Sequence, residues 1–172
     1  MILEKYLVPD YVFSAFTDVT PEFVKSISAA ALLCDIDNTL ATYDDPTPPD
    51  NVVRWIDEMQ KHGVSIAFVS NNEWERVKTF NRDLGLVAYA KAGKPGTDCL
   101  QRAANALGLD KDRCALLGDQ LLTDCAAGKR FGISTIIVPP IKDKKTPFFR
   151  FKRLLEVPYM QKYRKLHPDE RI

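Results

Sequence analysis

The stretch that decides the fold is Ala29-Ala-Ala-Leu-Leu-Cys-Asp-Ile-Asp-Asn-Thr-Leu40. Its small apolar run, residues 29–33, predicts a buried strand that ends at Asp35. Burying an unpaired carboxylate costs several kcal/mol, so the neighbouring acids Asp35 and Asp37 require a compensating charge. A magnesium ion, which prefers hard oxygen ligands, would provide that charge. The alternative for this stretch alone is a turn that begins at Asp37-Asn38 and is capped by Asp35.

The whole chain has the composition of an ordinary globular domain. It has 172 residues, of which 45% are hydrophobic and 27% charged, enough to bury one core. The net charge of +1 favours neither a nucleic acid nor an acidic partner. Residues 142–165, however, contain six Lys and three Arg against two acids, a net +7 that leaves −6 for the rest. We expect one domain over 1–172, with an N-terminal packing arm at 1–28, a catalytic core at 29–140 and a basic, aromatic tail at 141–172.

The cysteines and the N-terminus indicate the compartment. The four cysteines show no Cys-x-x-Cys spacing, which argues against zinc and against a disulfide framework and favours buried thiols in a reducing compartment. The first residues lack the charged start and long apolar core of a signal peptide. No stretch approaches the roughly 20 apolar residues of a membrane span. We therefore expect a cytoplasmic protein whose membrane contact, if any, is peripheral at the inner face.

Strands and helices alternate regularly along the chain. Apolar runs predict strands at 64–69, 86–90, 114–117 and 134–138 in addition to the first, and helical spacing of apolar residues predicts the helices between them. Short links between such elements indicate a parallel sheet covered by helices on both faces. The expected fold is therefore α/β, a Rossmann-like three-layer sandwich with a central parallel sheet of about five strands. In the N-terminal arm, Thr20-Pro21 predicts the start of a short helix.

Polar residues recur at the strand ends, which lie on one edge of a parallel sheet. Taken singly, Ser70 and Asp119 could cap helices and Lys94 could be a solvated loop lysine. Those alternatives weaken because all of them would have to coincide at one edge. The residues predicted to gather there are Asp35, Asp37, Ser70, Lys94, Asp119 and Asp124.

The ordered motifs resemble the haloacid dehalogenase (HAD) superfamily of phosphotransferases. They are Asp35-Ile-Asp-Asn-Thr39, Val69-Ser-Asn71, Lys94-Pro95 and Gly118-Asp-Gln-Leu-Leu-Thr-Asp124. The resemblance implies a HAD-like fold and a magnesium-dependent phosphatase, whose second acid, Asp37, distinguishes it from dehalogenases and phosphonatases.

The resemblance also implies a role for each residue. Asp35 would be the nucleophile that forms an aspartyl-phosphate, and Asp37 the general acid and base. Mg²⁺ would be held by Asp35, Asp119 and the main-chain carbonyl of Asp37. The remaining implied roles are phosphate binding for Thr39, Ser70, Asn71 and Lys94, and support of the metal or of Lys94 for Asp124.

The spacing of the motifs leaves no room for an inserted cap domain, which suits a large or surface-embedded substrate. The chain resembles the capless subclass IIIA and, within it, the bacterial YqeG family, through Leu7-Val-Pro-Asp-Tyr-Val12, Asp37-Asn-Thr-Leu40, Val69-Ser-Asn-Asn72, Glu75-Arg-Val77 and the motif at 118–124. Gly93 departs from the pattern, because a basic residue is expected before Lys94. That family is similar to mitochondrial phosphatidylglycerophosphate phosphatases, which implies a phospholipid head group as the leading substrate.

Other functions stay open at this point. Within the enzyme class, the substrate could be a soluble sugar phosphate, a nucleotide or a phosphoprotein. In another class, the protein could be an adaptor with a vestigial phosphate site, although the intact buried acids argue against it. Residues 144–165 interleave aromatics with cations as interfacial membrane segments do. The alternative is an amphipathic helix packed on the domain with Phe148, Phe151 and Leu155 inward. Nucleic acid is not expected, because no groove-reading motif accompanies the basic tail.

Overall fold

All neighbouring strands of the sheet are parallel, so their carboxyl ends share one edge. The computed structural model describes residues 3–142 and 146–169. Six strands pair in the order β1-β6-β5-β2-β3-β4. Their bounds are β1 Tyr11–Val12, β2 Ala31–Cys34, β3 Ser65–Val69, β4 Val87–Tyr89, β5 Cys114–Gly118 and β6 Ser134–Ile137. The first strand of the predicted core, β2, lies between β5 and β3, in the middle of the sheet.

Helices follow the strands as the spacing predicts. Thr20 begins the N-terminal arm's helix as expected, since its Oγ1 accepts a hydrogen bond from the Phe23 N–H at 3.2 Å. The last helix is far longer than the others. The helices are α1 Glu4–Leu7, α2 Pro21–Ser26, α3 Asp50–Lys61, α4 Trp74–Asn81, α5 Asp98–Ala106, α6 Ala126–Phe131 and α7 Pro147–Leu166, with short turns η1 Phe16–Asp18, η2 Lys111–Arg113 and η3 Leu121–Cys125.

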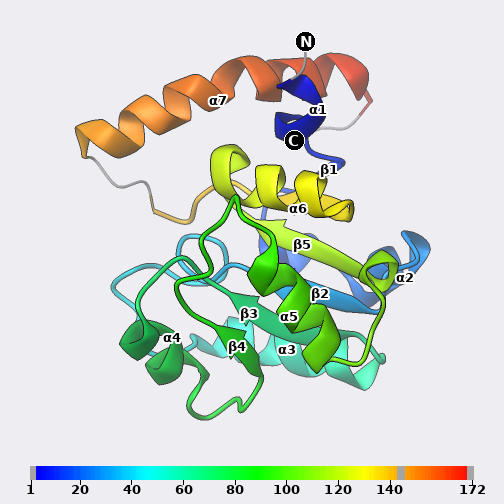
Figure 1. Cartoon of the computed structure of the whole chain (residues 1–172), viewed down its shortest axis with the longest axis vertical. Coiled ribbons are helices and arrows are strands. Elements are labelled where there is room, and N and C mark those ends of the chain that lie inside the picture. Colours follow the sequence, from blue (N-terminus) through cyan, green and yellow to red (C-terminus); the bar gives the residue numbers. More distant parts are fainter. Residues whose placement is uncertain (1–2, 143–145, 170–172) are drawn as a thin grey trace.

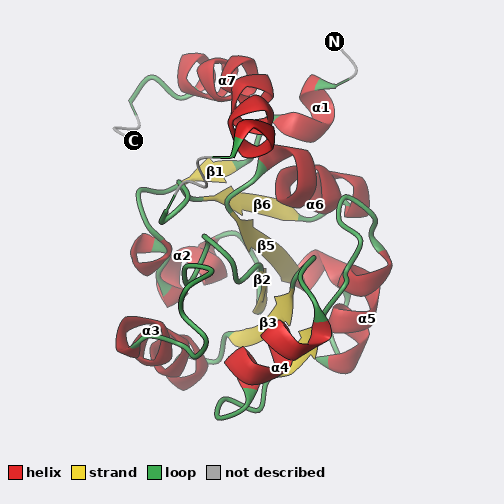
Figure 2. Ribbon diagram, turned by 90° about the vertical axis from the view of Figure 1, so that its left-hand side faces the viewer, coloured by secondary structure: helices red, strands yellow, loops and turns green. Residues whose placement is uncertain are grey.

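The sheet is covered on both faces. Helices α2, α3 and α4 pack on one face, and α5 and α6 on the other, as Figure 2 shows. Within β2, Leu32 and Cys34 face the first core while Ala31 and Leu33 face the second. A strand buried on both sides carries a continuous apolar run, which is why the sequence showed no alternation here. The predicted three-layer α/β architecture is confirmed.

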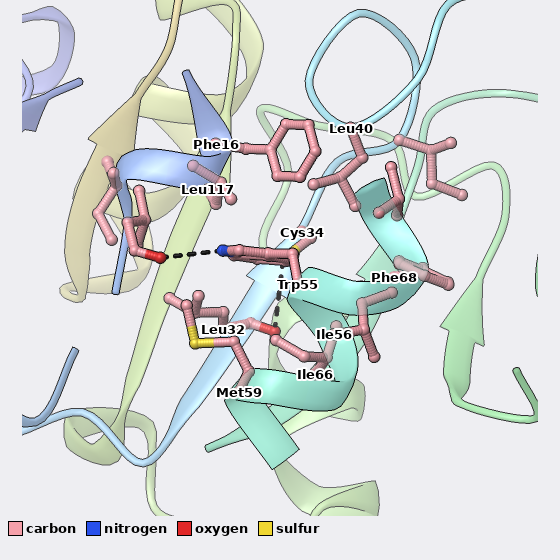
Figure 3. Close-up of a cluster of buried hydrophobic side chains, with 14 of the residues drawn as sticks. Phe16, Leu32, Cys34, Leu40, Trp55, Ile56, Met59, Ile66, Phe68 and Leu117 are labelled. Atoms are coloured by element: carbon pink, nitrogen blue, oxygen red, sulfur yellow. Dashed lines mark hydrogen bonds between the residues drawn. The ribbon is translucent and has the colours of Figure 1, made fainter. Parts of the chain in front are cut away.

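The N-terminal segment is part of the first core. The Trp55 indole of α3 lies edge-on to Phe16, with ring centroids 5.4 Å apart, and its N–H donates to the Val19 carbonyl at 2.9 Å (Figure 3). The same segment contributes β1, which adds a sixth strand beside β6 to the five that the sequence predicted. A strand of two residues, Tyr11–Val12, is too short to show a period.

Helix α7 lies across the end of the molecule beside α1, and Figure 1 shows it in orange. The Val12 N–H donates to the buried Tyr163 hydroxyl oxygen at 3.2 Å, and Lys162 forms an ion pair with Glu4. The face that contacts the domain carries Glu156 and Tyr163. None of the described helices combines the length and apolar content that a membrane crossing requires.

The expected inward orientation of the tail's apolar residues is wrong for two of them. Phe151 is 59% exposed and Leu155 is 43% exposed. The helix instead contacts the domain through Glu156, near its middle, and Tyr163, near its end, and both lie on a different face from Phe151 and Leu155. The side chain of Phe148 and residues 143–145, all within the predicted tail, lie outside the described part of the structure.

Candidate active site

The loop after β2 places two acids at the carboxyl edge of the sheet. Asn38 adopts a φ of 68°, a left-handed conformation that asparagine tolerates better than most residues. The Leu40 N–H donates to the Ile36 carbonyl at 3.0 Å and closes the turn. Both Asp35 and Asp37 are buried as a result. A turn is therefore present, but it is closed on the Ile36 carbonyl, and the Asp35 carboxylate pairs with Lys94 at 2.8 Å instead of capping the turn as the alternative expected.

Lys94 joins two of the acidic motifs. Its Nζ lies 2.8 Å from Asp35 Oδ1 and 2.6 Å from Asp124 Oδ1, and the residue is only 5% exposed. The Asn71 side chain holds the lysine's main chain: it accepts from the Lys94 N–H at 2.8 Å and donates to the Lys94 carbonyl at 2.9 Å. Gly93, the departure from the expected pattern, has a φ of 68°, where a basic side chain would be strained.

The turn after β5 places the other two acids. Asp119 directly follows the strand, and the π turn η3 returns the chain so that Asp124 Oδ2 accepts from the Gln120 N–H at 3.1 Å. A Cβ atom on Gly118 would collide with Cβ and Cγ of Asp124. Glycine at position 118 is thus explained by the close approach of the Asp124 side chain to the end of β5.

Three buried carboxylates converge at this point. Asp35, Asp119 and Asp124 each offer an oxygen, and the three oxygens lie within 4.8 Å of one another. Like charges at such distances repel strongly in a buried site. The sequence assigned Asp124 to a supporting role, and the structure places it among the metal-ligand candidates. Ligation through the Asp37 carbonyl stays a prediction.

The Asp37 carboxylate is held by two side chains outside this triad. Arg76 Nε donates to its Oδ1 at 3.0 Å, and Asn72 Nδ2 donates to its Oδ2 at 2.8 Å. Arg76 also donates to the Thr42 carbonyl at 3.1 Å and so ties α4 to the loop that carries the two acids. Sequence reasoning missed Arg76 and Asn72 as site residues, because the strand-end rule selects residues directly after a strand. Arg76 lies inside a helix.

The last two predicted site residues are Ser70 and Thr39. Ser70 is buried, and its Oγ accepts from the Asn72 N–H at 3.1 Å; it does not cap helix α4, as the alternative expected, because the N-cap residue of α4 is Glu73. It also lines the pocket at the strand ends. Thr39 Oγ1 donates to Asp119 Oδ1 at 3.4 Å, which places this predicted phosphate ligand beside a metal-ligand candidate.

A cavity of about 440 Å³ opens over these residues, within the usual size of a small-molecule site. In the described chain, the segment from β2 to β3 holds one loop and α3, and the segment from β3 to β4 holds α4, so no cap domain covers the cavity. Lys152 of α7 also lines it. The full lining is Asp35, Asp37, Tyr43, Ser70, Asn71, Asn72, Gln120, Thr123, Asp124 and Lys152.

Burial shifts the protonation of the site. Desolvation raises the pKa of Asp35 to about 7, against the opposing effect of Lys94, and raises the pKa of Asp119 to about 8. Desolvation would lower the Lys94 pKa, but Asp124 and Asp35 raise it above its ordinary value. Lys94 is therefore a permanent cation between two acids.

The charge balance fits a divalent cation. Five carboxylates are buried around the site, where Lys94, Arg76 and Arg153 pair with members of this set and Lys152 lines the cavity; the five are Asp35, Asp37, Asp119, Asp124 and Glu156. A hard divalent ion held by the oxygens of Asp35, Asp119 and Asp124 would offset the remaining charge.

The raised pKa values predict how stability depends on pH. Asp35 and Asp119 rise from 3.8 to about 7 and about 8, so the folded protein binds protons more tightly than the unfolded chain. In EDTA, the free energy of unfolding should fall as pH rises from about 4 to about 8. Urea titrations across this range measure it. Asp119→Asn should flatten the slope, and Mg²⁺ should restore stability at pH 8; an unchanged slope in this variant would contradict the assignment.

Comparisons with known proteins identify the family. A HAD-hydrolase-like family model matches residues 91–145. A probable phosphatase, YqeG of Bacillus subtilis strain 168, is 37% identical over 155 residues, which are 90% of this chain and 90% of that protein. The chain belongs to the YqeG family of HAD-type phosphatases. The resemblance seen in the ordered motifs is thereby confirmed.

Solved structures show the same fold at low sequence identity. The cobalt-bound deoxy-D-mannose-octulosonate 8-phosphate phosphatase of Haemophilus influenzae has a TM-score of 0.52 at 13% identity, over 81% of this chain and 93% of its own. An uncharacterized Listeria monocytogenes protein has a TM-score of 0.54 at 19% identity, over 69% of this chain and 85% of its own. These likenesses concern the HAD-like fold.

Proposed function

We propose that this YqeG-family protein is a magnesium-dependent phosphatase that hydrolyses a phosphomonoester through an aspartyl-phosphate. The observation that carries the proposal is the convergence of Asp35, Lys94, Asp119 and Asp124 beside an open cavity, which Asp35 and Asp124 line. A magnesium ion bound by the three carboxylates would offset the negative charge of the phosphate as it meets Asp35.

Asp35 is the nucleophile of the first step. One carboxylate oxygen forms a bond to phosphorus while the bond from phosphorus to the ester oxygen breaks. Lys94, 2.8 Å from the Asp35 carboxylate, is placed to stabilise the charge that spreads over the phosphoryl oxygens. Ser70 lines the same cavity and can donate its hydroxyl proton to one of those oxygens.

Asp37 transfers the proton in both steps. It lines the cavity with Asp35, and the donors Arg76 and Asn72 fix its carboxylate. Asp37 gives its proton to the departing ester oxygen, which leaves as an alcohol. It then takes a proton from the water that attacks phosphorus, and the new bond releases inorganic phosphate and regenerates Asp35.

The leading substrate class is a phospholipid with a terminal phosphate, for which phosphatidylglycerophosphate is the test compound. The cavity is uncapped, and α7, which contributes Lys152 to its lining, exposes several apolar side chains, among them the neighbouring Phe151, Leu154 and Leu155. Arg150, Arg164 and Lys165 lie on the same helix and are exposed. An apolar strip with flanking cations suits an anionic membrane surface, where each cation contributes about 1 kcal/mol.

Phosphate release in the presence of Mg²⁺ tests both the phosphatase activity and the lipid substrate class. Phosphatidylglycerophosphate in mixed micelles is compared with a panel containing a sugar phosphate, a nucleotide and a phosphopeptide, each with the Asp35→Asn variant alongside. Lipid turnover far above the panel supports both chemistry and substrate class. Turnover of the soluble esters alone keeps the phosphatase and discards the lipid. No turnover of any of them, with Mg²⁺ bound, favours the adaptor.

Membrane contact has its own test. Replacing Phe151, Leu154 and Leu155 together by serine should weaken binding to phosphatidylglycerol-containing vesicles by more than about tenfold, because burying even one such side chain contributes about 1.5–3 kcal/mol. Vesicle co-sedimentation measures it, with neutral vesicles as the reference. The control is Trp74→Ser, which removes an apolar side chain that is also exposed but lies on α4. Equal binding of the triple variant and wild type would rule out this surface.

A further inference from the structure

Helix α7 reaches the end of β5 through Arg153. Its Nη1 donates to the main-chain carbonyl of Asp119 at 2.6 Å, and its Nη2 forms an ion pair with the Asp119 carboxylate. The planar guanidinium thus contacts the main chain and the side chain of one residue through two N–H groups, whose fixed relative geometry a lysine does not provide. Asp119 is itself buried and belongs to the acidic triad.

Glu156, one helical turn further along α7, contacts both Arg153 and the turn η3. Its Oε2 accepts from Arg153 Nη1 at 2.9 Å. Its Oε1 accepts from the N–H groups of Leu121 at 2.8 Å and Leu122 at 3.2 Å. These groups open the π turn η3, where main-chain donors have no partner within the turn. The same turn carries Asp124, the third member of the triad.

We propose that Arg153 and Glu156 are positioning residues for the divalent-metal site. Arg153 fixes the orientation of Asp119, and Glu156 fixes the turn that presents Asp124, so two of the three candidate ligands are set by a helix outside the sheet and its covering layers. The inference rests on the proposed function in one respect, that the acidic triad binds a divalent ion.

A purely structural role makes a different prediction. Contacts away from the site also hold α7 on the domain, among them the Lys162–Glu4 ion pair and the hydrogen bond from Val12 to Tyr163. If Arg153 only fastened the helix, its loss would resemble the loss of Lys162. If Arg153 positions Asp119, its loss changes metal affinity while the loss of Lys162 does not.

The test is calorimetric titration of the full chain with Mg²⁺. We expect Arg153→Gln to raise the Mg²⁺ dissociation constant at least tenfold, and Arg153→Lys, which keeps the charge but loses the fork, to give an intermediate value. Lys162→Gln, the control on the same helix, should stay within twofold of wild type. Circular dichroism checks folding, and the Arg153→Lys variant carries the test if Arg153→Gln does not fold. Saturating Mg²⁺ should restore most of the turnover of Arg153→Gln.

Three outcomes would overturn the inference. An unchanged Mg²⁺ affinity in both Arg153 variants would leave α7 with a structural role only. A tighter affinity would show that Arg153 competes with the metal for Asp119. Absence of Mg²⁺ binding by the wild type would overturn the metal-dependent function as well, and the wild-type titration separates that failure from the other two.

Discussion

Replacing Asp35 by asparagine is expected to lower kcat by about 10⁴-fold or more, the scale on which loss of a nucleophile acts. The amide cannot form the bond to phosphorus, yet it keeps an oxygen that can accept from Lys94, which lies 2.8 Å from Asp35 Oδ1. The fold should therefore persist while the chemistry stops. Phosphate release at saturating substrate and Mg²⁺ measures the loss.

The matched control is Asp57→Asn, the same change at an exposed position of α3. It should leave kcat within the error of the assay. Full turnover by a folded Asp35→Asn protein would contradict the proposed mechanism, in which the Asp35 carboxylate forms the bond to phosphorus.

Lys94→Met is expected to destabilise the metal-free protein by about 3–5 kcal/mol at pH 8, as when one partner of a buried ion pair is removed. The lysine lies between Asp35 and Asp124, and methionine of similar length would leave both carboxylates buried without that cation. Urea unfolding in EDTA measures the loss. The difference from wild type should shrink as pH falls toward 7, because without Lys94 the Asp35 carboxyl binds a proton more tightly than the wild-type group, whose pKa is about 7.

The control lies three residues earlier. Lys91 forms an exposed ion pair with Glu73 at 2.8 Å, so Lys91→Met should cost only about 0–1 kcal/mol. Mg²⁺ should recover part of the stability of Lys94→Met through binding to the folded state. Equal stability of the two variants would mean that Lys94 does not balance the buried acids.

Much of the site follows from local sequence. Short apolar runs gave the strands, and the parallel order then brings residues that directly follow β2, β3 and β5 to one edge. Asp35, Ser70 and Asp119 lie there because each stands at such a strand end. Lys94 follows a shorter strand, β4. Its position depends on a hydrogen bond between its main chain and the Asn71 side chain, a contact that no spacing rule predicts.

Other features depend on contacts between distant segments. Arg153 and Glu156 are 34 or more residues away in sequence from Asp119 and from the groups of η3 that they contact. An amphipathic pattern predicts that the most apolar face of α7 turns inward, but the helix is oriented by Glu156 and Tyr163, which are buried on another face. Helical periodicity cannot predict that orientation. A carboxylate such as that of Glu156 is favoured in a buried position only where main-chain N–H groups can donate hydrogen bonds to it.

The place of α7 in the chain has a consequence for synthesis. A ribosome adds residues 29–140 before it adds the 20 residues of α7, which take about 1–4 s more. During that interval the nascent chain already contains Asp35, Lys94 and Asp124, but not yet Arg153 and Glu156. On the proposed role of these two residues, the groups that hold Asp119 and the turn η3 are among the last to be synthesised, and the metal site becomes fully ordered only after α7 has left the ribosome and docked on the domain.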